Sequence, residues 1–203
     1  MKVVSPLAFG ALLFSLTLAV PALAQSSTTT PSTHSAAVAQ AKRSLAPGKE
    51  AKDFQLQAVA GELSGDVRLS KVNAEGTVVV VLLRGFPGQQ CPACSAQVAD
   101  FVKNAGKFAA RNTRVLLIYP GAKPQLPQHA GDFLQGTQLP APLTFLLDPD
   151  LQFTEAYGLR WDAVNETSYP STLVINQEGT ITFAKISDTH KGRATAAEVL
   201  AAL

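Results

Sequence analysis

The chain has 203 residues, a formal net charge of +2 at pH 7, and charged side chains at only 16% of its positions. Acidic and basic residues are interspersed, so the charge gives no reason to expect nucleic acid or an anionic membrane surface as a partner. Its two cysteines and three histidines are few for a zinc site, which usually takes four ligands. The scarcity of histidine also argues against a hydrolase with a Ser-His-Asp triad.

The first 24 residues are typical of a signal peptide. Lys2 supplies the positive start, Leu7–Val20 the apolar core, and Ala22–Ala24 the small residues that signal peptidase recognises. We therefore expect cleavage before Gln25 and an exported protein, periplasmic or secreted, that has no membrane association once the signal is removed. A retained N-terminal anchor is the alternative, although the apolar core is short for a transmembrane helix.

Residues 25–45 are rich in Ser, Thr, Ala and Gln, which predicts a flexible linker. Residues 46–203 are enough for one domain with a sizeable core. In this part, segments typical of strands alternate with segments typical of helices. Strands are expected at 53–59, 67–69, 77–84, 114–119, 143–147, 171–175 and 180–186. Helices are expected from the cysteines to Phe108, at 123–135, at 150–157, and at 195–203 after a capping-box pattern.

This order predicts an α/β fold in which a central mixed β-sheet carries helices on both faces and an N-terminal β-hairpin extends the sheet. The segment 77–84 is almost continuous Val and Leu, as expected of a strand covered on both sides. The turn at 176–179 is expected to join the last two strands as a hairpin.

The most informative motif is Cys91-Pro92-Ala93-Cys94, which follows the buried strand at 77–84 and begins a helix. A cysteine at a helix start is expected to have a lowered pKa, because helix N–H groups stabilise its thiolate. Cys91 is then the nucleophile and Cys94, one turn further, resolves the intermediate as a disulfide. A purely structural disulfide is the alternative, but so short a loop removes little entropy from the unfolded chain.

A binding protein is an alternative from another class. His190 follows the expected strand ending at Ile186, and the thiolates of Cys91 and Cys94 together with this histidine could hold a copper ion. On the redox interpretation, no cofactor is expected.

The segment Tyr169-Pro170-Ser171-Thr172 precedes the penultimate strand. Together with the Cys-x-x-Cys motif, it resembles the thioredoxin fold, in which this proline is cis and lies against the reactive cysteine. Residues 47–56, 147–159 and 171–181 resemble the redoxin branch of that superfamily, the alkyl hydroperoxide reductase/thiol-specific antioxidant relatives of peroxiredoxins. The resemblance implies a catalytic contribution from Pro170 and a cis Tyr169–Pro170 bond.

The chain departs from the peroxiredoxin pattern around the nucleophile. With Cys91 aligned as the peroxidatic cysteine, Arg84 and Gly88 occupy the positions of the family's Pro and Thr. With Cys94 aligned instead, Pro87 matches the family's Pro but Cys91 stands at the Thr position, so neither alignment gives the full motif. The family's peroxide-orienting arginine falls on Pro170. Arg84 or Arg160 are the candidates to replace that arginine, while Phe86 either forms an apolar lip or only packs. The candidate substrate-contacting residues are therefore Arg84, Phe86, Gly88, Arg160 and Tyr169.

The residues and the resemblance together predict an exported thiol-dependent oxidoreductase that cycles between a Cys91–Cys94 dithiol and disulfide. The oxidant is either a peroxide or a protein disulfide. The partners implied are a thiol or disulfide protein, including a thioredoxin-type reductant. A thioredoxin-type oxidoreductase without peroxidase activity is the alternative.

Overall fold

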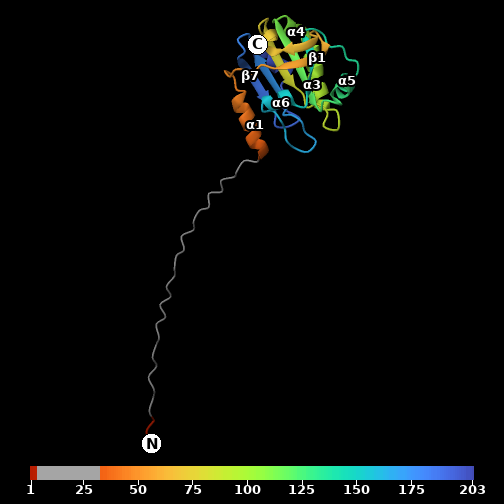
Figure 1. Cartoon of the computed structure of the whole chain (residues 1–203). Helices are drawn as coiled ribbons and strands as arrows, with labels where there is room; N and C mark the ends of the chain where they lie inside the picture. Colours follow the sequence, from red (N-terminus) through yellow and green to blue (C-terminus); the bar gives the residue numbers. More distant parts are fainter. Residues whose placement is uncertain (4–32) are drawn as a thin grey trace. The chain divides into compact units, whose positions relative to one another are not determined.

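The computed structural model describes residues 1–3 and 33–203. Its strands are β1 Gln55–Gly61, β2 Gly65–Arg68, β3 Thr77–Leu82, β4 Thr113–Gly121, β5 Leu143–Pro149, β6 Ser171–Ile175 and β7 Ile181–Ile186. Its helices are α1 Thr33–Ser44, α2 Leu69–Asn73, α3 Pro92–Lys103, α4 Ala105–Ala109, α5 Leu126–Leu134, α6 Gln152–Ala156 and α7 Ala196–Ala201. The expected alternation of strands and helices is confirmed (Figure 1).

The strands form one mixed sheet in the order β2-β1-β5-β4-β3-β6-β7. At its centre, β3, β4 and β5 are parallel, while β6 and β7 are antiparallel additions beside β3. The β1–β2 hairpin pairs with β5 and lengthens the sheet at the opposite edge. This arrangement confirms the predicted thioredoxin-like sheet with an N-terminal hairpin extension.

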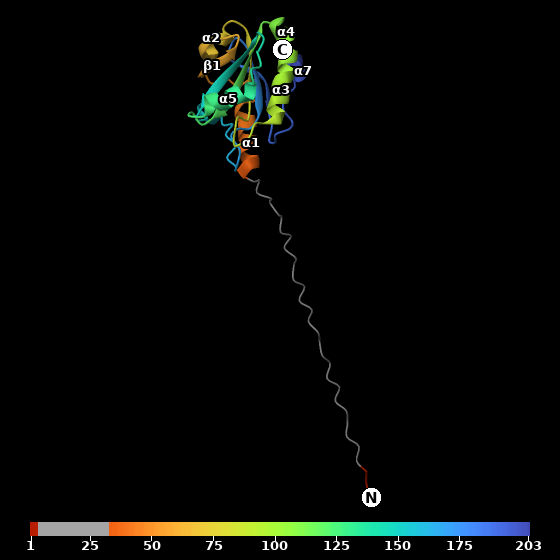
Figure 2. The same cartoon turned by 90° about the vertical axis from the view of Figure 1, so that its right-hand side faces the viewer.

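Alternate residues of the central strands face two separate cores, because side chains in a strand point alternately to opposite faces. One core takes Val79 and Val81 of β3 and is covered by α3, α4, α5 and α7. The other core takes Val78 and Val80 and is covered by α1, α2 and α6. Figure 2 shows α3 and α7 side by side on the first face, where the main-chain N–H of Ala196 donates to Asp100 (2.7 Å).

The expected linker at 25–45 is wrong from Thr33 onward, because that part of the chain forms α1. Val38, Ala41 and Leu45 are buried in the second core, and α1 packs beside β7. Their spacing places all three on one side of a helix, which buries apolar surface even in an otherwise polar segment. The packed region therefore begins before residue 46. The predicted signal peptide and the first part of the predicted linker lie outside the described residues, apart from residues 1–3.

The predicted cis bond before Pro170 is also wrong. Within the part of the chain that the structure describes, Ala141–Pro142 is the only cis peptide bond. Hydrogen bonding of extended type continues on both sides of the Tyr169–Pro170 bond, with Tyr169 N–H donating to Leu159 O and Pro170 O accepting from Ser187 N–H. The Tyr169–Pro170 bond therefore has the trans form that X–Pro bonds usually prefer. Across residues 1–3 and 33–203, the helices are all too short or too polar to span a bilayer.

Candidate active site

The two cysteines lie where the chain leaves the central strand β3 and enters α3. The connecting loop bends at Gly85, whose φ is +73°. A Cβ at Gly85 would lie 1.9 Å from Pro120 O, so only glycine permits this close approach of the loop to the end of β4. The buried strand and this turn together place Cys91 at the start of the helix.

Cys91 is the N-cap residue of α3 and Pro92 is its first helical residue, a position that proline favours. The main-chain N–H of Cys94 donates to Cys91 Sγ at 3.4 Å. Both side chains belong to the first core: Cys91 is 3% exposed and Cys94 is fully buried. The two cysteines are not joined by a disulfide.

The two sulfurs have opposite acidities. A hydrogen bond from the Cys94 side chain lowers the pKa of Cys91 to about 5, helped by the Cys94 N–H and by the positive charges of Arg193 and Arg84, against the cost of burial. The same hydrogen bond and burial raise the pKa of Cys94. Near neutral pH, Cys91 is therefore the thiolate and Cys94 the thiol, as the sequence predicts.

Arg193 is the charged partner of Cys91 that sequence reasoning missed. Its Nη2 lies 3.6 Å from Cys91 Sγ, its Nη1 donates to Gln97 Oε1 (3.1 Å), and its Nε donates to His190 O (3.1 Å). Arg193 belongs to the loop between β7 and α7, 102 residues from Cys91. No local pattern in the sequence marks it; only the packing of α7 against α3 brings the loop to the sulfur.

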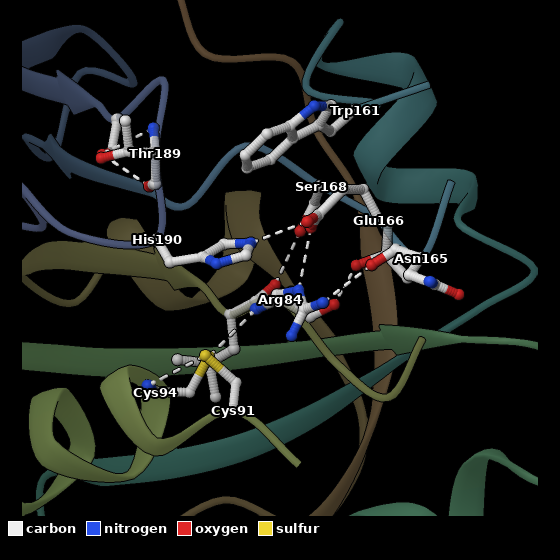
Figure 3. A network of polar contacts seen from close by, with 12 residues as sticks. Arg84, Cys91, Cys94, Trp161, Asn165, Glu166, Ser168, Thr189 and His190 are labelled. Carbon is white, nitrogen blue, oxygen red and sulfur yellow. Dashed lines mark hydrogen bonds and ion pairs between the residues drawn. The ribbon is translucent and has the colours of Figure 1, made fainter. Parts of the chain in front are cut away.

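Arg84 lies on the other side of the pair, beside Cys94. Its main-chain N–H donates to Cys94 Sγ at 3.4 Å. Its guanidinium points away, to Glu166 Oε2 (2.8 Å) and Asn165 O (2.7 Å). Figure 3 shows Glu166 between Arg84 and His190, whose Nε2 lies 2.8 Å from Glu166 Oε1. Arg84 thus lies beside Cys94 through its backbone, and its contact with a substrate stays a prediction.

The predicted lip residues lie in the loop before Cys91. Phe86 packs against the first core and stacks on His129, with ring centroids 3.9 Å apart, so the packing alternative describes it. Gly88 is exposed and lines a hollow of about 230 Å³ together with Arg84, Pro87, Gln89 and Asn165. That hollow adjoins the Arg84 side of the site, and Cys91 is not among its lining residues.

The placement of Tyr169 and Arg160 corrects their predicted role as substrate contacts. Tyr169 is buried in the second core, stacked on Trp161, on the other side of the sheet from the cysteines. Arg160 Nη1 donates to the carbonyl oxygens of Trp161, Glu166 and Thr167, so its guanidinium is used in holding this loop. Pro170 is buried directly before β6, and its neighbour Ser171 lies opposite Leu82 at the end of β3.

The copper alternative does not fit the structure. His190 Nε2 is occupied by Glu166 rather than turned to the two sulfurs. Among the described residues, no group of three His, Cys, Asp or Glu side chains is arranged to hold a metal ion. The predicted copper site of Cys91, Cys94 and His190 is therefore wrong.

Comparison with known proteins agrees with this geometry. The model of the AhpC/TSA family matches residues 47–184. A Mycobacterium tuberculosis protein named as a candidate peroxiredoxin is 27% identical over 146 residues, which cover 70% of this chain and 85% of the relative.

Among solved structures, Mycobacterium tuberculosis peroxidoxin BcpB superposes with a TM-score of 0.60 at 18% identity, covering 77% of this chain and 94% of that one. A Chlorobium tepidum protein described as a thiol:disulfide interchange protein superposes with a TM-score of 0.56 at 24% identity, covering 78% and 99%. At these identities the structures show the fold alone. With the family match, the reactive sulfur at the head of α3 and the thioredoxin-like sheet, the chain belongs to the AhpC/TSA family and is a cysteine-based oxidoreductase.

Proposed function

We propose that this protein is an exported thiol peroxidase, which reduces a small hydroperoxide with Cys91 and closes a Cys91–Cys94 disulfide. The observation that carries the proposal is the environment of Cys91: a thiolate only 3% exposed, with the Arg193 guanidinium 3.6 Å from its sulfur. A peroxide presents a single oxygen to the sulfur, so it needs a smaller opening around Cys91 than a protein disulfide, which must bring two sulfurs into line with the attacking thiolate. A peroxide is small enough to reach it.

The reaction balances with the groups present. The Cys91 thiolate attacks one peroxide oxygen, the O–O bond breaks, and the other oxygen leaves and takes a proton from solvent as water or an alcohol. Cys91 is thereby oxidised by two electrons to a sulfenic acid. The Cys94 sulfur then attacks Cys91, the S–O bond breaks, and the Cys94 proton leaves with the hydroxyl as water.

The two cysteines lie in the first turn of α3, where the Cys94 N–H already contacts Cys91 Sγ at 3.4 Å, so the disulfide is proposed to close within that turn. Turnover requires two electrons from outside. A dithiol protein of the thioredoxin type is the proposed donor: it attacks the disulfide and leaves with the oxidising equivalents.

Thiol–disulfide exchange without peroxidase activity is the second candidate. The Cys-x-x-Cys spacing at a helix start favours it, because this arrangement suits rapid exchange with another disulfide.

Stopped-flow mixing separates the two candidates. The reduced protein is mixed with hydrogen peroxide or with a small disulfide, and thiol loss and Trp161 fluorescence are followed. Oxidation by peroxide several orders of magnitude faster than that of a free thiol, yielding a Cys91–Cys94 disulfide, is expected. Peroxide oxidation at the rate of a free thiol, beside rapid exchange with the small disulfide, would replace the peroxidase proposal with the exchange proposal. Cys91→Ser is the control for both reactions.

Export is proposed from residues 1–24, whose pattern is that of a signal peptide. Sequencing the N-terminus of the protein isolated from its native host tests it: a start at Gln25 is expected. A protein that retains Met1 and stays in the cytoplasm would contradict export without affecting the chemistry.

A further inference from the structure

Glu166 takes no part in the proposed reaction, but its side chain connects Arg84 and His190. It sits in the loop between α6 and β6, and its side chain is only 11% exposed. Oε2 binds Arg84 Nε at 2.8 Å and Oε1 binds His190 Nε2 at 2.8 Å, as Figure 3 shows. Neither sulfur is among its hydrogen-bond partners. Its two oxygens therefore join two segments that each lead to one cysteine.

From each oxygen, contacts lead on to a different sulfur. On one side, Arg84 presents its main-chain N–H to Cys94 Sγ. On the other side, the carbonyl of His190 accepts from Arg193 Nε, and Arg193 Nη2 reaches Cys91 Sγ. One carboxylate thus lies behind the hydrogen-bond donors of both cysteines.

The two sides are anchored unequally. Next to Glu166, the hydroxyls of Thr167 and Ser168 donate to the carbonyls of Arg84 and Leu83, which fixes this loop to the end of β3. The His190 side chain is 43% exposed, and it contacts Glu166 and the ring of Trp161. Glu166 is therefore the fixed point to which the more exposed loop of His190 and Arg193 is attached.

A buried carboxylate between two cationic or polar side chains is seldom explained by stability alone, because its desolvation offsets most of the gain from pairing. We propose that Glu166 is a positioning residue, which holds the His190 loop so that Arg193 stays against Cys91, and holds Arg84 so that its N–H stays against Cys94. This inference rests on the proposed roles of the two sulfurs, but not on which oxidant they meet.

Positioning by Glu166 and a simple effect of its charge shift the pKa of Cys91 in opposite directions when Glu166 is replaced. Cys91 faces Cys94, Arg193 and Arg84, and Glu166 is the carboxylate joined to this set. If Glu166 acted only through its negative charge, Glu166→Gln would lower the pKa of Cys91, because an anion near a thiolate is removed. If Glu166 positions Arg193, the same substitution raises that pKa, because the guanidinium moves away from the sulfur.

The experiment titrates the reduced protein, following the ultraviolet absorbance of the thiolate, with alkylation and mass spectrometry to identify Cys91. Glu166→Gln is expected to raise the midpoint by about one pH unit, which slows alkylation of Cys91 by roughly five- to tenfold near pH 4.5 and leaves it unchanged near pH 8. Glu178→Gln, which removes the same charge from an exposed turn, is the matched control and is expected to titrate as the parent does.

A double-mutant cycle shows whether Glu166 acts through Arg193. Arg193→Gln alone is expected to raise the midpoint, and adding Glu166→Gln is expected to raise it little further, because the group being positioned is gone. A midpoint that falls or stays constant in Glu166→Gln, or that rises equally in both backgrounds, overturns the proposal. If Glu166→Gln does not fold, His190→Ala replaces it: it removes the His190 contacts to Glu166 and Trp161, keeps the Arg84–Glu166 ion pair, and is judged by the same cycle with Arg193→Gln.

The titration needs no oxidant, so it is independent of the proposed function. A raised midpoint in Glu166→Gln together with no reaction with peroxide would keep the positioning role and reject the peroxidase. Rapid peroxide reduction together with an unchanged midpoint in Glu166→Gln would support the peroxidase and reject the positioning role.

Discussion

Each of the two sulfurs of the site accepts one long-range hydrogen bond, and the two donors come from different regions of the molecule. Cys94 meets the end of β3, where the donor is the main-chain N–H of Arg84. Cys91 Sγ accepts from the neighbouring N–H of Cys94, and its long-range donor is the half-buried Arg193 in the loop between β7 and α7. The first donor is neutral and fixed by the sheet, whereas the second is charged and lies at the end of a long side chain.

This difference separates two requirements of a dithiol reaction. The nucleophile needs a positive charge close to its sulfur, and Arg193 helps to lower the pKa of Cys91. The resolving sulfur needs only a fixed place one helical turn away, and burial keeps it protonated until it reacts. The charged loop thus adds a positive charge beside the nucleophile, whose acidity depends most on the Cys94 side chain, while the end of the sheet fixes the position of Cys94.

Exchanging each cysteine for serine is expected to have the largest effect on peroxide consumption, and the effect should differ between the two positions. Cys91→Ser should lower the rate of peroxide consumption by about 10³-fold or more, because a serine hydroxyl is a weak nucleophile without an activating base. Cys94→Ser should still consume the first equivalent of peroxide but stop at a sulfenic acid on Cys91. Stopped-flow kinetics with mass spectrometry measures both. Full activity in Cys91→Ser would remove Cys91 from the mechanism.

The pH dependence is expected to report Cys91 alone. Because the pKa of Cys91 is lowered to about 5, its alkylation rate should rise about tenfold per pH unit below that value and level off above it. Cys94, whose pKa is raised, should stay unmodified throughout the neutral range. Alkylation followed by mass spectrometry measures each sulfur separately. A midpoint near that of a free thiol, about 8.5, would show that the Cys91 thiolate is not stabilised.

The Cys94 side could be predicted from the sequence far better than the Cys91 side. A buried strand, a glycine-containing loop and a Cys-x-x-Cys at a helix start are local patterns, and all of them lie within residues 77–103. The β6–β7 hairpin and the capping box of Thr195 and Glu198 are also local, and both are confirmed.

Arg193 and Glu166 could not be found in this way, since they reach Cys91 and Arg84 across 102 and 82 residues of sequence. Their positions depend on the packing of loops, for which one sequence holds no periodic signal. Helix α1 was missed for another reason: its composition is that of a linker, and the stripe of Val38, Ala41 and Leu45 is narrow.

Replacing Arg193 is expected to change the reactivity of Cys91 and to leave that of Cys94 unchanged. Arg193→Gln should raise the pKa of Cys91 and slow its alkylation several-fold below about pH 5, because the positive charge beside the thiolate is lost. Arg193→Lys should restore part of the effect, as it keeps the charge but not the contacts to Gln97 and His190. Alkylation of the three proteins over a pH series measures this. Equal rates in all of them would show that Arg193 only covers the sulfur.

Ser168→Ala probes the fixed side and is expected to have the smallest effect on reactivity. The Ser168 hydroxyl is fully buried and donates to Leu83 O at 2.8 Å, so its removal leaves a buried carbonyl without this donor. The free energy of unfolding should fall by about 1–3 kcal/mol, measured by urea denaturation, with Ser95→Ala on the exposed side of α3 as the control. Alkylation of Cys91 should keep its pH midpoint, because Arg193 approaches from the other loop. A shifted midpoint would show that the end of β3 also sets the acidity of Cys91, and the two regions would then act as one.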